Sequence, residues 1–327
     1  MEQRVFGRSG QRASVIGLGT WQLGADWGEV GEPAALAVLD AAAEAGVTFF
    51  DTADVYGDGR SERLIAAYLR SRPDAGITVA TKMGRRVPQA PEQYSLANFR
   101  AWTDRSRANL GVDTLDLVQL HCPPTAVFSS DEVFDALDTL VAEERIAAYG
   151  VSVETCEEAL TAVARPGTAS VQIILNPFRL KPLERVLPAA LAAGVGIIAR
   201  VPLASGLLSG RYTEKTEFAP DDHRTYNRRG EAFDQGETFS GVDFATGVAA
   251  AGKFAALAPE GATSAQTALR WVAQQPGVTT VIPGARSPEQ VRANVAAAAL
   301  PPLPEATLAG IRRIYDERIR AQVHHRW

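Results

Sequence analysis

The sequence predicts an α/β protein, a closed barrel of eight parallel strands that alternate with helices. Short β-rich runs alternate with helical stretches along the 327-residue chain, and there are eight β-rich runs. Alternation implies parallel strands, and eight strands favour a closed barrel over an open sheet. The alternative is an open doubly wound sheet, but no GxGxxG follows a strand at the start of a helix. We therefore expect a (β/α)8 TIM barrel formed by residues 1–327 as a single domain.

The predicted elements begin with a β-hairpin, in which Gln3–Phe6 and Arg12–Ile16 flank a Gly/Ser turn. The barrel strands are expected at Val15–Thr20, Thr48–Ala53, Ile77–Lys82, Leu115–His121, Ala147–Ser152, Val171–Asn176, Gly196–Val201 and Thr279–Pro283. Helical periodicity is expected at Pro33–Ala45, Ser61–Arg70, Leu96–Leu110, Asp131–Arg145, Thr155–Ala164, Leu183–Ala193 and Ala265–Gln274. Beyond two prolines, an extra C-terminal helix is predicted from Glu305 to Ala321.

Two polar segments interrupt the alternation. Arg85–Tyr94 carries prolines and charges after the third strand, and Ala204–Val242 is a long segment after the seventh. Loops beyond about 12 to 15 residues are usually functional or disordered. On a barrel, both segments would lie over the face where the strands end.

Composition excludes several functional classes. The net charge is −5 and the Lys and Arg residues are scattered, which argues against a nucleic acid or an anionic membrane surface as partner. Cys122 and Cys156 form no CxxC pair and no Cys/His cluster with zinc spacing, so no metal site is predicted. No window approaches the roughly 20 apolar residues of a membrane helix, and the start of the chain lacks a long apolar run. We expect a cytoplasmic protein with free thiols.

A set of reactive side chains gathers at the ends of three neighbouring strands. The stretch FFDTADVYGDGRSE places Asp51 at a strand end and Tyr56 in the loop that follows, and the next two strands end in Lys82 and His121. Each residue by itself is more often structural. Together they occupy the carboxyl ends of barrel strands, where the active sites of such barrels lie.

The motifs GLGTWQLG, FFDTADVYGDGRSE, ATKMG, DLVQLH, YGVS, PLASGLLSGRY and VIPGARSPEQVRANV carry a resemblance to the aldo-keto reductases over nearly the whole chain. The resemblance implies reduction of a small-molecule carbonyl substrate, an aldehyde or ketone, by hydride transfer from C4 of NADPH. It implies that Tyr56 is the proton donor and that His121 orients the carbonyl. Lys82, held by Asp51, is expected to lower the pKa of Tyr56 from about 10.

The resemblance also implies a cofactor site for NADPH/NADP+. Ser152 and Gln172 would hold the carboxamide, and the amides of Gly206, Leu207 and Ser209 would face the pyrophosphate. Arg286 would bind the 2'-phosphate at a helix start. The alternative, purely structural interpretation of SPEQVRAN is a helix capped by Ser287. The full predicted set is Gly19, Thr20, Trp21, Asp51, Ser152, Gln172, Arg200, Pro202, Leu203, Gly206, Leu207, Ser209, Gly210, Arg211, Pro283, Gly284, Arg286, Gln290 and Asn294.

Two positions depart from the family pattern. Val153 stands where many members have Asn, and Arg200 stands where many have an aromatic residue against the nicotinamide; a planar guanidinium can take over that stacking.

The substrate site is expected to be lined by Trp21, Trp27, Tyr56 and His121. These residues do not distinguish aromatic aldehydes, medium-chain aldehydes, sugars and quinones as substrates. The alternative function is an NADP(H)-binding regulatory or sensor subunit with little turnover. The sequence leaves the oligomeric state open.

Overall fold

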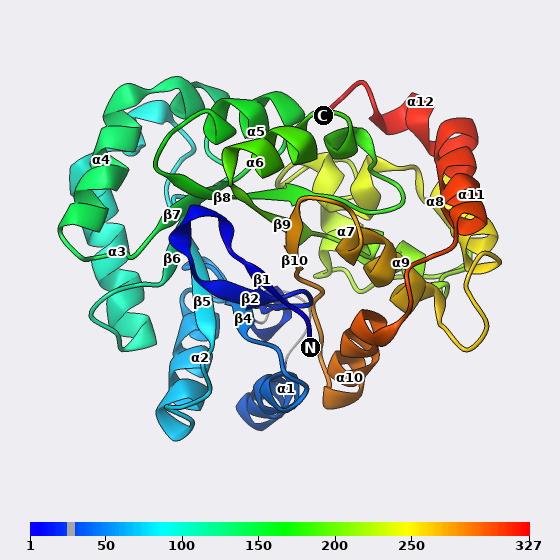
Figure 1. Ribbon diagram of the computed structural model, residues 1–327, viewed down its shortest axis with the longest axis horizontal. Coiled ribbons are helices and arrows are strands. Elements are labelled where there is room, and N and C mark those ends of the chain that lie inside the picture. The colour runs from blue at the N-terminus through cyan, green and yellow to red at the C-terminus, as the bar shows by residue number, and fades with distance from the viewer. Residues whose placement is uncertain (25–29) are drawn as a thin grey trace.

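The computed structural model describes residues 1–24 and 30–327. Eight strands form one parallel sheet in sequence order from β3 to β10. The two edge strands approach each other, because the amide of Gly17 donates to the carbonyl of Val281 over 2.8 Å and the amide of Gly19 donates to that of Pro283 over 3.1 Å. The sheet thereby curls into the predicted barrel, surrounded by helices (Figure 1). The prediction of a (β/α)8 barrel is confirmed.

The barrel strands are short and largely buried, as expected for parallel strands covered on both faces. Their bounds are β3 Leu18–Gly19, β4 Phe49–Asp51, β5 Thr78–Met83, β6 Leu117–His121, β7 Tyr149–Ser152, β8 Thr168–Ile174, β9 Gly196–Arg200 and β10 Val278–Val281. Each matches one predicted run. The first, second, fourth, fifth and seventh are shorter than expected, the third begins and ends one residue later, and the sixth and eighth begin and end earlier.

The helices follow the strands as predicted. They are α1 Glu32–Glu44, α2 Arg60–Ser71, α3 Leu96–Leu110, α4 Asp131–Ala142, α5 Cys156–Val163, α6 Val186–Ala193, α7 His223–Tyr226, α8 Phe244–Ala255, α9 Ser264–Ala273, α10 Pro288–Val295, α11 Glu305–Ile314 and α12 Arg320–Val323. Helices α7 and α8 were not predicted, although Asp222 and Asp243 cap them by accepting from the amides of Arg224 and Thr246. The predicted last helix is interrupted by the π-helical turn Tyr315–Ile319 between α11 and α12.

A hairpin closes the end of the barrel where the strands begin. Strands β1 (Gln3–Val5) and β2 (Arg12–Ser14) pair antiparallel, as predicted. Phe6 between them stacks on Phe49 at 5.2 Å, within a small buried cluster that also contains Ala80, Leu117 and Ile198. This packing fills one end of the barrel, so the carboxyl ends of the strands form the accessible face.

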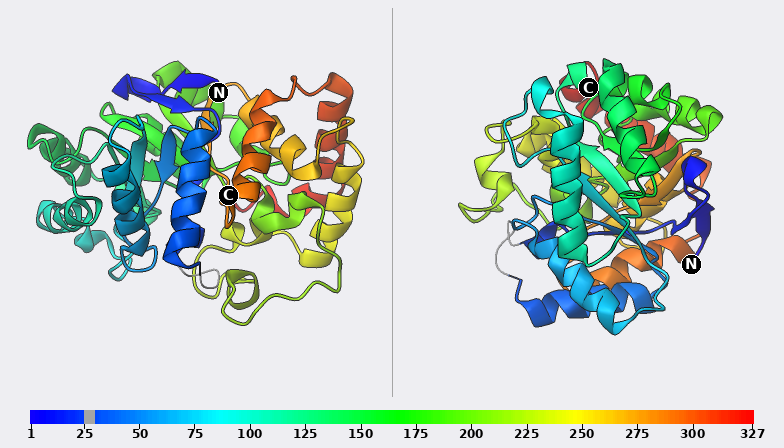
Figure 2. Two further views of the ribbon diagram at one scale, coloured as in Figure 1. Left: turned by 90° about the horizontal axis from the view of Figure 1, so that it is seen from below. Right: turned by 90° about the vertical axis from the view of Figure 1, so that its left-hand side faces the viewer.

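The segment between β9 and α8 is irregular and projects from the body of the barrel, coloured yellow-green in Figure 2. Trp327 anchors part of it: the indole Nε1 donates to Asp234 Oδ1 over 3.0 Å and the ring lies 4.0 Å from the Arg179 guanidinium. Within the described part of the chain, no helix is long and apolar enough to cross a membrane.

Candidate active site

The ends of β4 and β5 bring an aspartate, a lysine and a tyrosine into direct contact. Lys82 Nζ donates to Asp51 Oδ2 over 2.7 Å, to the Thr52 carbonyl over 2.8 Å and to the Tyr56 hydroxyl over 3.3 Å. The lysine and aspartate side chains are only 1% and 4% exposed. The neighbouring carboxylate stabilises the charged form of Lys82 in this buried position. The ammonium can therefore act on the phenol.

His121 completes the predicted group of four. It ends β6, next to β5 in the sheet, and its ring lies 5.9 Å from that of Tyr56 with the planes at 84°. The structure therefore brings Asp51, Tyr56, Lys82 and His121 together at one end of the barrel. Adjacent parallel strands place their last residues at the same edge, which is why the sequence could predict this assembly.

Two glutamines orient Asp51, and their role there was not predicted. Gln172 Nε2 donates to Asp51 Oδ1 over 2.7 Å, and Gln119 Nε2 does so over 3.4 Å. The sequence predicts a cofactor contact for Gln172, so its bond to Asp51 is an additional role. The signal in the sequence was a polar residue inside each of two otherwise apolar strands, since buried amides need partners.

The protonation of Tyr56 differs from expectation. Burial raises the pKa of Tyr56 above 10, and the opposing effect of the Lys82 ammonium is smaller. The expected lowering of this pKa is therefore wrong, because desolvation of the phenolate outweighs the effect of the nearby Lys82 charge. Tyr56 is a neutral phenol at physiological pH, the form that can donate a proton.

His121 is neutral as well. Burial lowers the pKa of His121 well below 6.5, and the cations Arg85, Lys82 and Arg200 lower it further. Its Nδ1 is buried and has no hydrogen-bond partner among the described residues. A neutral imidazole in this place offers an N–H to a carbonyl oxygen without acting as an acid.

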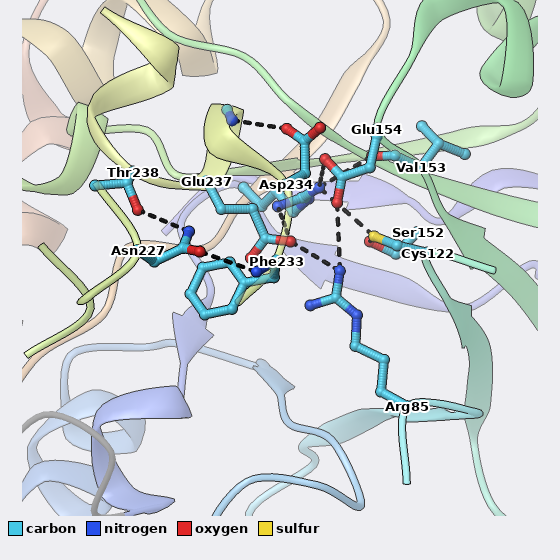
Figure 3. A network of polar contacts seen from close by, with 12 residues as sticks. Arg85, Cys122, Ser152, Val153, Glu154, Asn227, Phe233, Asp234, Glu237 and Thr238 are labelled. Carbon is cyan, nitrogen blue, oxygen red and sulfur yellow. Dashed lines mark hydrogen bonds and ion pairs between the residues drawn. The ribbon is translucent and has the colours of Figure 1, made fainter. Parts of the chain in front are cut away.

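A buried network of charges lies beside this group at the ends of β7 and β9 (Figure 3). Arg200 Nη2 donates to the Val153 carbonyl over 3.0 Å and to Glu154 Oε2 over 2.9 Å. Arg85 Nη2 donates to Glu237 Oε1 over 2.9 Å. Neither Glu154 nor Glu237 was predicted, because Glu154 lies two residues beyond the end of β7 and Glu237 lies in the irregular segment after β9.

Ser152 lies next to this network. Its Oγ is 3.3 Å from the Cys122 sulfur, and the same sulfur is 3.6 Å from Arg200 Nη2. The structure thus places Ser152 and Arg200 on one patch of the site, where both approach Cys122. The carbonyl of Val153, rather than its side chain, supplies the polar contact there.

The predicted pyrophosphate loop follows β9. Residues after Pro202 and Leu203 form the 3-10 turn Ala204–Ser209, with Gly206 at φ 95°. A Cβ at Gly206 would collide with the Tyr212 hydroxyl, and the positive φ disfavours other residues, so glycine suits this turn. Ser209 Oγ donates to the Gly206 carbonyl over 2.6 Å, and Gly210 and Arg211 continue the chain past the turn.

The predicted adenine and 2'-phosphate residues surround the start of α10. Ser287 caps the helix, Gln290 Oε1 accepts from the Arg286 amide over 2.7 Å, and Asn294 Nδ2 donates to the Gly284 carbonyl over 3.2 Å. The guanidinium of Arg286 is exposed and has no hydrogen-bond or ion-pair partner within the described ranges. A free cation at a helix start fits a phosphate group, and Pro283 connects this loop to the barrel.

The first loop contributes an aromatic wall. Trp21 stacks on Tyr56 with centroids 6.0 Å apart and meets the Phe233 ring at 5.9 Å. The amide of Thr20, one residue earlier, donates to the Asp51 carbonyl over 2.9 Å and ties this loop to β4. Trp27, the other predicted wall residue, lies outside the described residues.

Comparison with known proteins decides the family, since the model of the "Aldo/keto reductase family" matches residues 15–316. The chain belongs to the aldo/keto reductase family. This member is 29% identical to the aldo-keto reductase YhdN of Bacillus subtilis, over 90% of its own length and 87% of the relative. It also resembles the probable voltage-gated potassium channel subunit beta of Oryza sativa, at 28% identity over 93% of each chain.

Solved structures agree with this assignment. The aldo/keto reductase resembles the glycerol dehydrogenase AKR11B4 from Gluconobacter oxydans with a TM-score of 0.78 and 28% identity, covering 97% of this chain and 95% of that one. It resembles an aldo-keto reductase from Klebsiella pneumoniae in complex with NADPH with a TM-score of 0.72 and 25% identity, covering 96% of each chain. The family and the barrel expected from the sequence are thus confirmed.

Proposed function

We propose that this aldo/keto reductase uses NADPH to reduce aldehydes and ketones to alcohols. The observation that carries the proposal is the contact of Lys82 with both Asp51 and Tyr56, beside His121 at the accessible end of the barrel. A neutral phenol, an adjacent ammonium and a neutral imidazole suit proton transfer to a developing alkoxide.

Each residue of this group has a separate role in the proposed reduction. Tyr56 donates its hydroxyl proton to the carbonyl oxygen of the substrate, and His121 donates a hydrogen bond that orients this oxygen. Lys82 stabilises the tyrosinate that remains after the transfer, because its ammonium is only 3.3 Å from the phenol oxygen. Asp51 keeps Lys82 charged and in place, and Gln172 holds Asp51.

NADPH fits the residues at the remaining strand ends and supplies the hydride when bound. Ser152 and Arg200 would hold its nicotinamide end, and the turn at Gly206 would receive the pyrophosphate. Arg286 would bind the 2'-phosphate, which accounts for its exposed guanidinium. The known structure that includes NADPH covers nearly the whole chain, which supports this choice of cofactor.

The test is the loss of NADPH absorbance when the purified protein is mixed with a panel of aldehydes and ketones. Multiple turnovers with a carbonyl substrate are expected.

The similarity to a potassium channel subunit favours a second candidate, an NADP(H)-binding regulatory subunit. Tight binding of NADPH without multiple turnovers on the whole panel would favour that candidate and contradict the reductase.

A further inference from the structure

Trp327 is a buried residue that contacts the irregular segment between β9 and α8. Only 5% of its surface is exposed. Its indole Nε1 donates to Asp234 Oδ1 over 3.0 Å and lies 3.2 Å from Oδ2 of the same carboxylate. The guanidinium of Arg179 lies over the ring, 4.0 Å from its centre, where a cation is attracted to the electron-rich face. The indole is therefore held both at its edge and on its face.

The backbone of residues 234–241 has glycines where it comes close to this indole. A Cβ at Gly241 would collide with the ring of Trp327, and a Cβ at Gly236 would lie 3.1 Å from a ring atom. Gly241 also has φ 76°, a conformation that glycine adopts readily. Next to the ring, Arg326 Nη2 donates to Gln235 Oε1 over 2.6 Å. The segment and the tryptophan therefore fit closely against each other.

A first chain of contacts leads from Trp327 to Arg200 through this segment. Asp234 caps the 3-10 turn Gln235–Glu237, because its Oδ1 accepts from the amide of Gly236 over 2.7 Å. Glu237 ends that turn, and its Oε1 lies 3.6 Å from Arg200 Nη1. Figure 3 shows Asp234 and Glu237 together in the charged network. The indole thus fixes the carboxylate that starts the turn, and the turn places the carboxylate that faces Arg200.

A second chain of contacts runs through Arg179. While its guanidinium lies over the indole of Trp327, Arg179 Nη2 donates to the carbonyl of Glu154 over 2.9 Å. Glu154 Oε2 in turn accepts from Arg200 Nη2 over 2.9 Å. Both arginines are buried, so solvent screens these contacts little. Trp327 therefore supports both of the acids that hold Arg200.

The same segment supports the turn expected to receive the pyrophosphate. Ser205 Oγ donates to the carbonyl of Glu237 over 3.0 Å and accepts from the amide of Phe239 over 3.1 Å. Ser205 has φ 53°, which is unfavourable for a residue other than glycine. Its bonds to the segment help to hold this backbone conformation. A displaced segment would therefore disturb the turn as well as Arg200.

Position, and not charge, is what Trp327 contributes to this network. Three arginines face three acids in it, namely Arg85, Arg179 and Arg200 with Glu154, Asp234 and Glu237. An indole is uncharged, so its removal leaves this balance unchanged. Any effect of a substitution at Trp327 then reports on where the charged groups lie.

We propose that Trp327 is a positioning residue for the cofactor site: through Asp234 and Arg179 it holds Arg200 and the turn at Ser205 where NADPH binds. This inference rests on the proposed function, in which Arg200 lies at the nicotinamide end of NADPH and the turn receives the pyrophosphate. The adenosine end of the cofactor is expected at α10 and does not depend on Trp327.

The first experiment measures two affinities of Trp327→Ala by isothermal titration calorimetry. The ligands are NADPH and adenosine 2',5'-bisphosphate, which has the 2'-phosphate but lacks the pyrophosphate and the nicotinamide. The affinity for NADPH is expected to fall about 3- to 30-fold, the range for residues that act through a contact network, while that for the bisphosphate stays nearly unchanged. Equal losses for both ligands, or no loss for either, would overturn the inference.

The wild-type protein separates this inference from the proposed function. Failure of the wild-type protein to bind NADPH would contradict the proposed cofactor itself. Wild-type binding of NADPH with the same affinity in Trp327→Ala would contradict only the role of Trp327. Neither measurement requires turnover of a carbonyl substrate.

Two further variants control for the loss of a large buried side chain. Trp327→Phe keeps an aromatic ring beside Arg179 and removes the N–H donor, so it is expected to weaken NADPH binding less than Trp327→Ala and again to spare the bisphosphate. Trp102→Ala is the matched control, because this half-buried indole packs on Tyr94 and Phe99 at α3. A loss of NADPH affinity in Trp102→Ala as large as that in Trp327→Ala would overturn the assignment.

Variants of Asp234 test the contact through which Trp327 acts. Asp234→Asn keeps an oxygen that accepts from the indole and should bind NADPH nearly as the wild type does, whereas Asp234→Ala should weaken it. The double variant Trp327→Ala/Asp234→Ala is expected to lose no more affinity than the weaker-binding single variant, because both substitutions break one contact. Fully additive losses would show that the two residues act independently and would overturn the proposed route.

Discussion

Lys82 Nζ lies 2.7 Å from Asp51 Oδ2, and both side chains are almost wholly buried. The contact joins two strands whose sequences lie 31 residues apart. A buried ion pair of this kind contributes little net stability by itself. The loss of one partner, however, leaves the other charge buried without a counter-ion. The pair fixes a cation beside the proposed proton donor.

Substitution of Tyr56 by Phe tests the proton donor. The variant is expected to lose about 10²- to 10⁴-fold in kcat, the usual contribution of general acid catalysis. NADPH binding, measured by the change in cofactor fluorescence, should be retained. Tyr68→Phe is the control, because Tyr68 lies on the outer helix α2 and should keep full activity. Unchanged turnover in Tyr56→Phe would contradict the assigned role.

Substitution of Lys82 by Met separates stability from chemistry. Leaving Asp51 buried without its partner is expected to lower the free energy of unfolding by about 3–5 kcal/mol, measured by urea denaturation. The double variant Lys82→Met/Asp51→Asn removes both charges and should recover part of this loss. Its activity should stay as low as that of the single variant. Recovery of turnover in the double variant would show that the ammonium is dispensable.

The pH dependence of reduction follows from two shifted groups. The pKa of Tyr56 is raised and that of His121 is lowered well below 6.5, so both are neutral around pH 7. The kcat for reduction is expected to be flat from about pH 6 to about pH 9 and to fall only where the phenol ionises, above about 10. A clear inflection near pH 6.5 would indicate that protonated His121 takes part.

Asp54 makes stability depend on pH in a predictable direction. Burial and the neighbouring Glu62 carboxylate raise the pKa of Asp54 to about 7. Its pKa in the unfolded chain is about 3.9, so between these values the native state binds a proton that the unfolded state lacks. The stability from this group is complete below the unfolded pKa and is lost as the pH rises through about 7.

Asp54→Asn should therefore stabilise the protein more at pH 8.5 than at pH 4, by on the order of 2–4 kcal/mol in the free energy of unfolding. Urea denaturation at the two pH values provides the measurement. Asp113→Asn, at an exposed position, serves as control and should show no such difference between the two pH values. A pH-independent effect of Asp54→Asn would show that the buried carboxyl is not the cause.

Arg286→Ala tests the choice of cofactor. The variant should weaken NADPH binding by about 1.5–3 kcal/mol, the scale of a hydrogen bond to a charged group, and leave NADH binding nearly unchanged. Titration of cofactor fluorescence gives both affinities. Arg292→Ala is the matched control, because Arg292 lies within α10, the helix that Arg286 precedes, and faces Glu289. Equal losses for both cofactors would assign Arg286 another role.

The sequence by itself determined the barrel and the group of four residues at its open end. Alternating strands and helices leave few arrangements other than parallel strands. Because these strands all end at one edge, residues at neighbouring strand ends must meet there, as Asp51, Lys82 and His121 do. Local patterning was therefore sufficient for both.

Tertiary structure alone decided the network around Glu237 and the protonation of Tyr56. Glu237 meets Arg85 across 152 residues of chain, from an irregular segment whose path no periodic pattern specifies. The pKa of Tyr56 depends on how burial balances the charge of Lys82, and only three-dimensional packing sets that balance. Sequence fixes which groups a strand end presents, whereas desolvation and long-range partners depend on the folded chain.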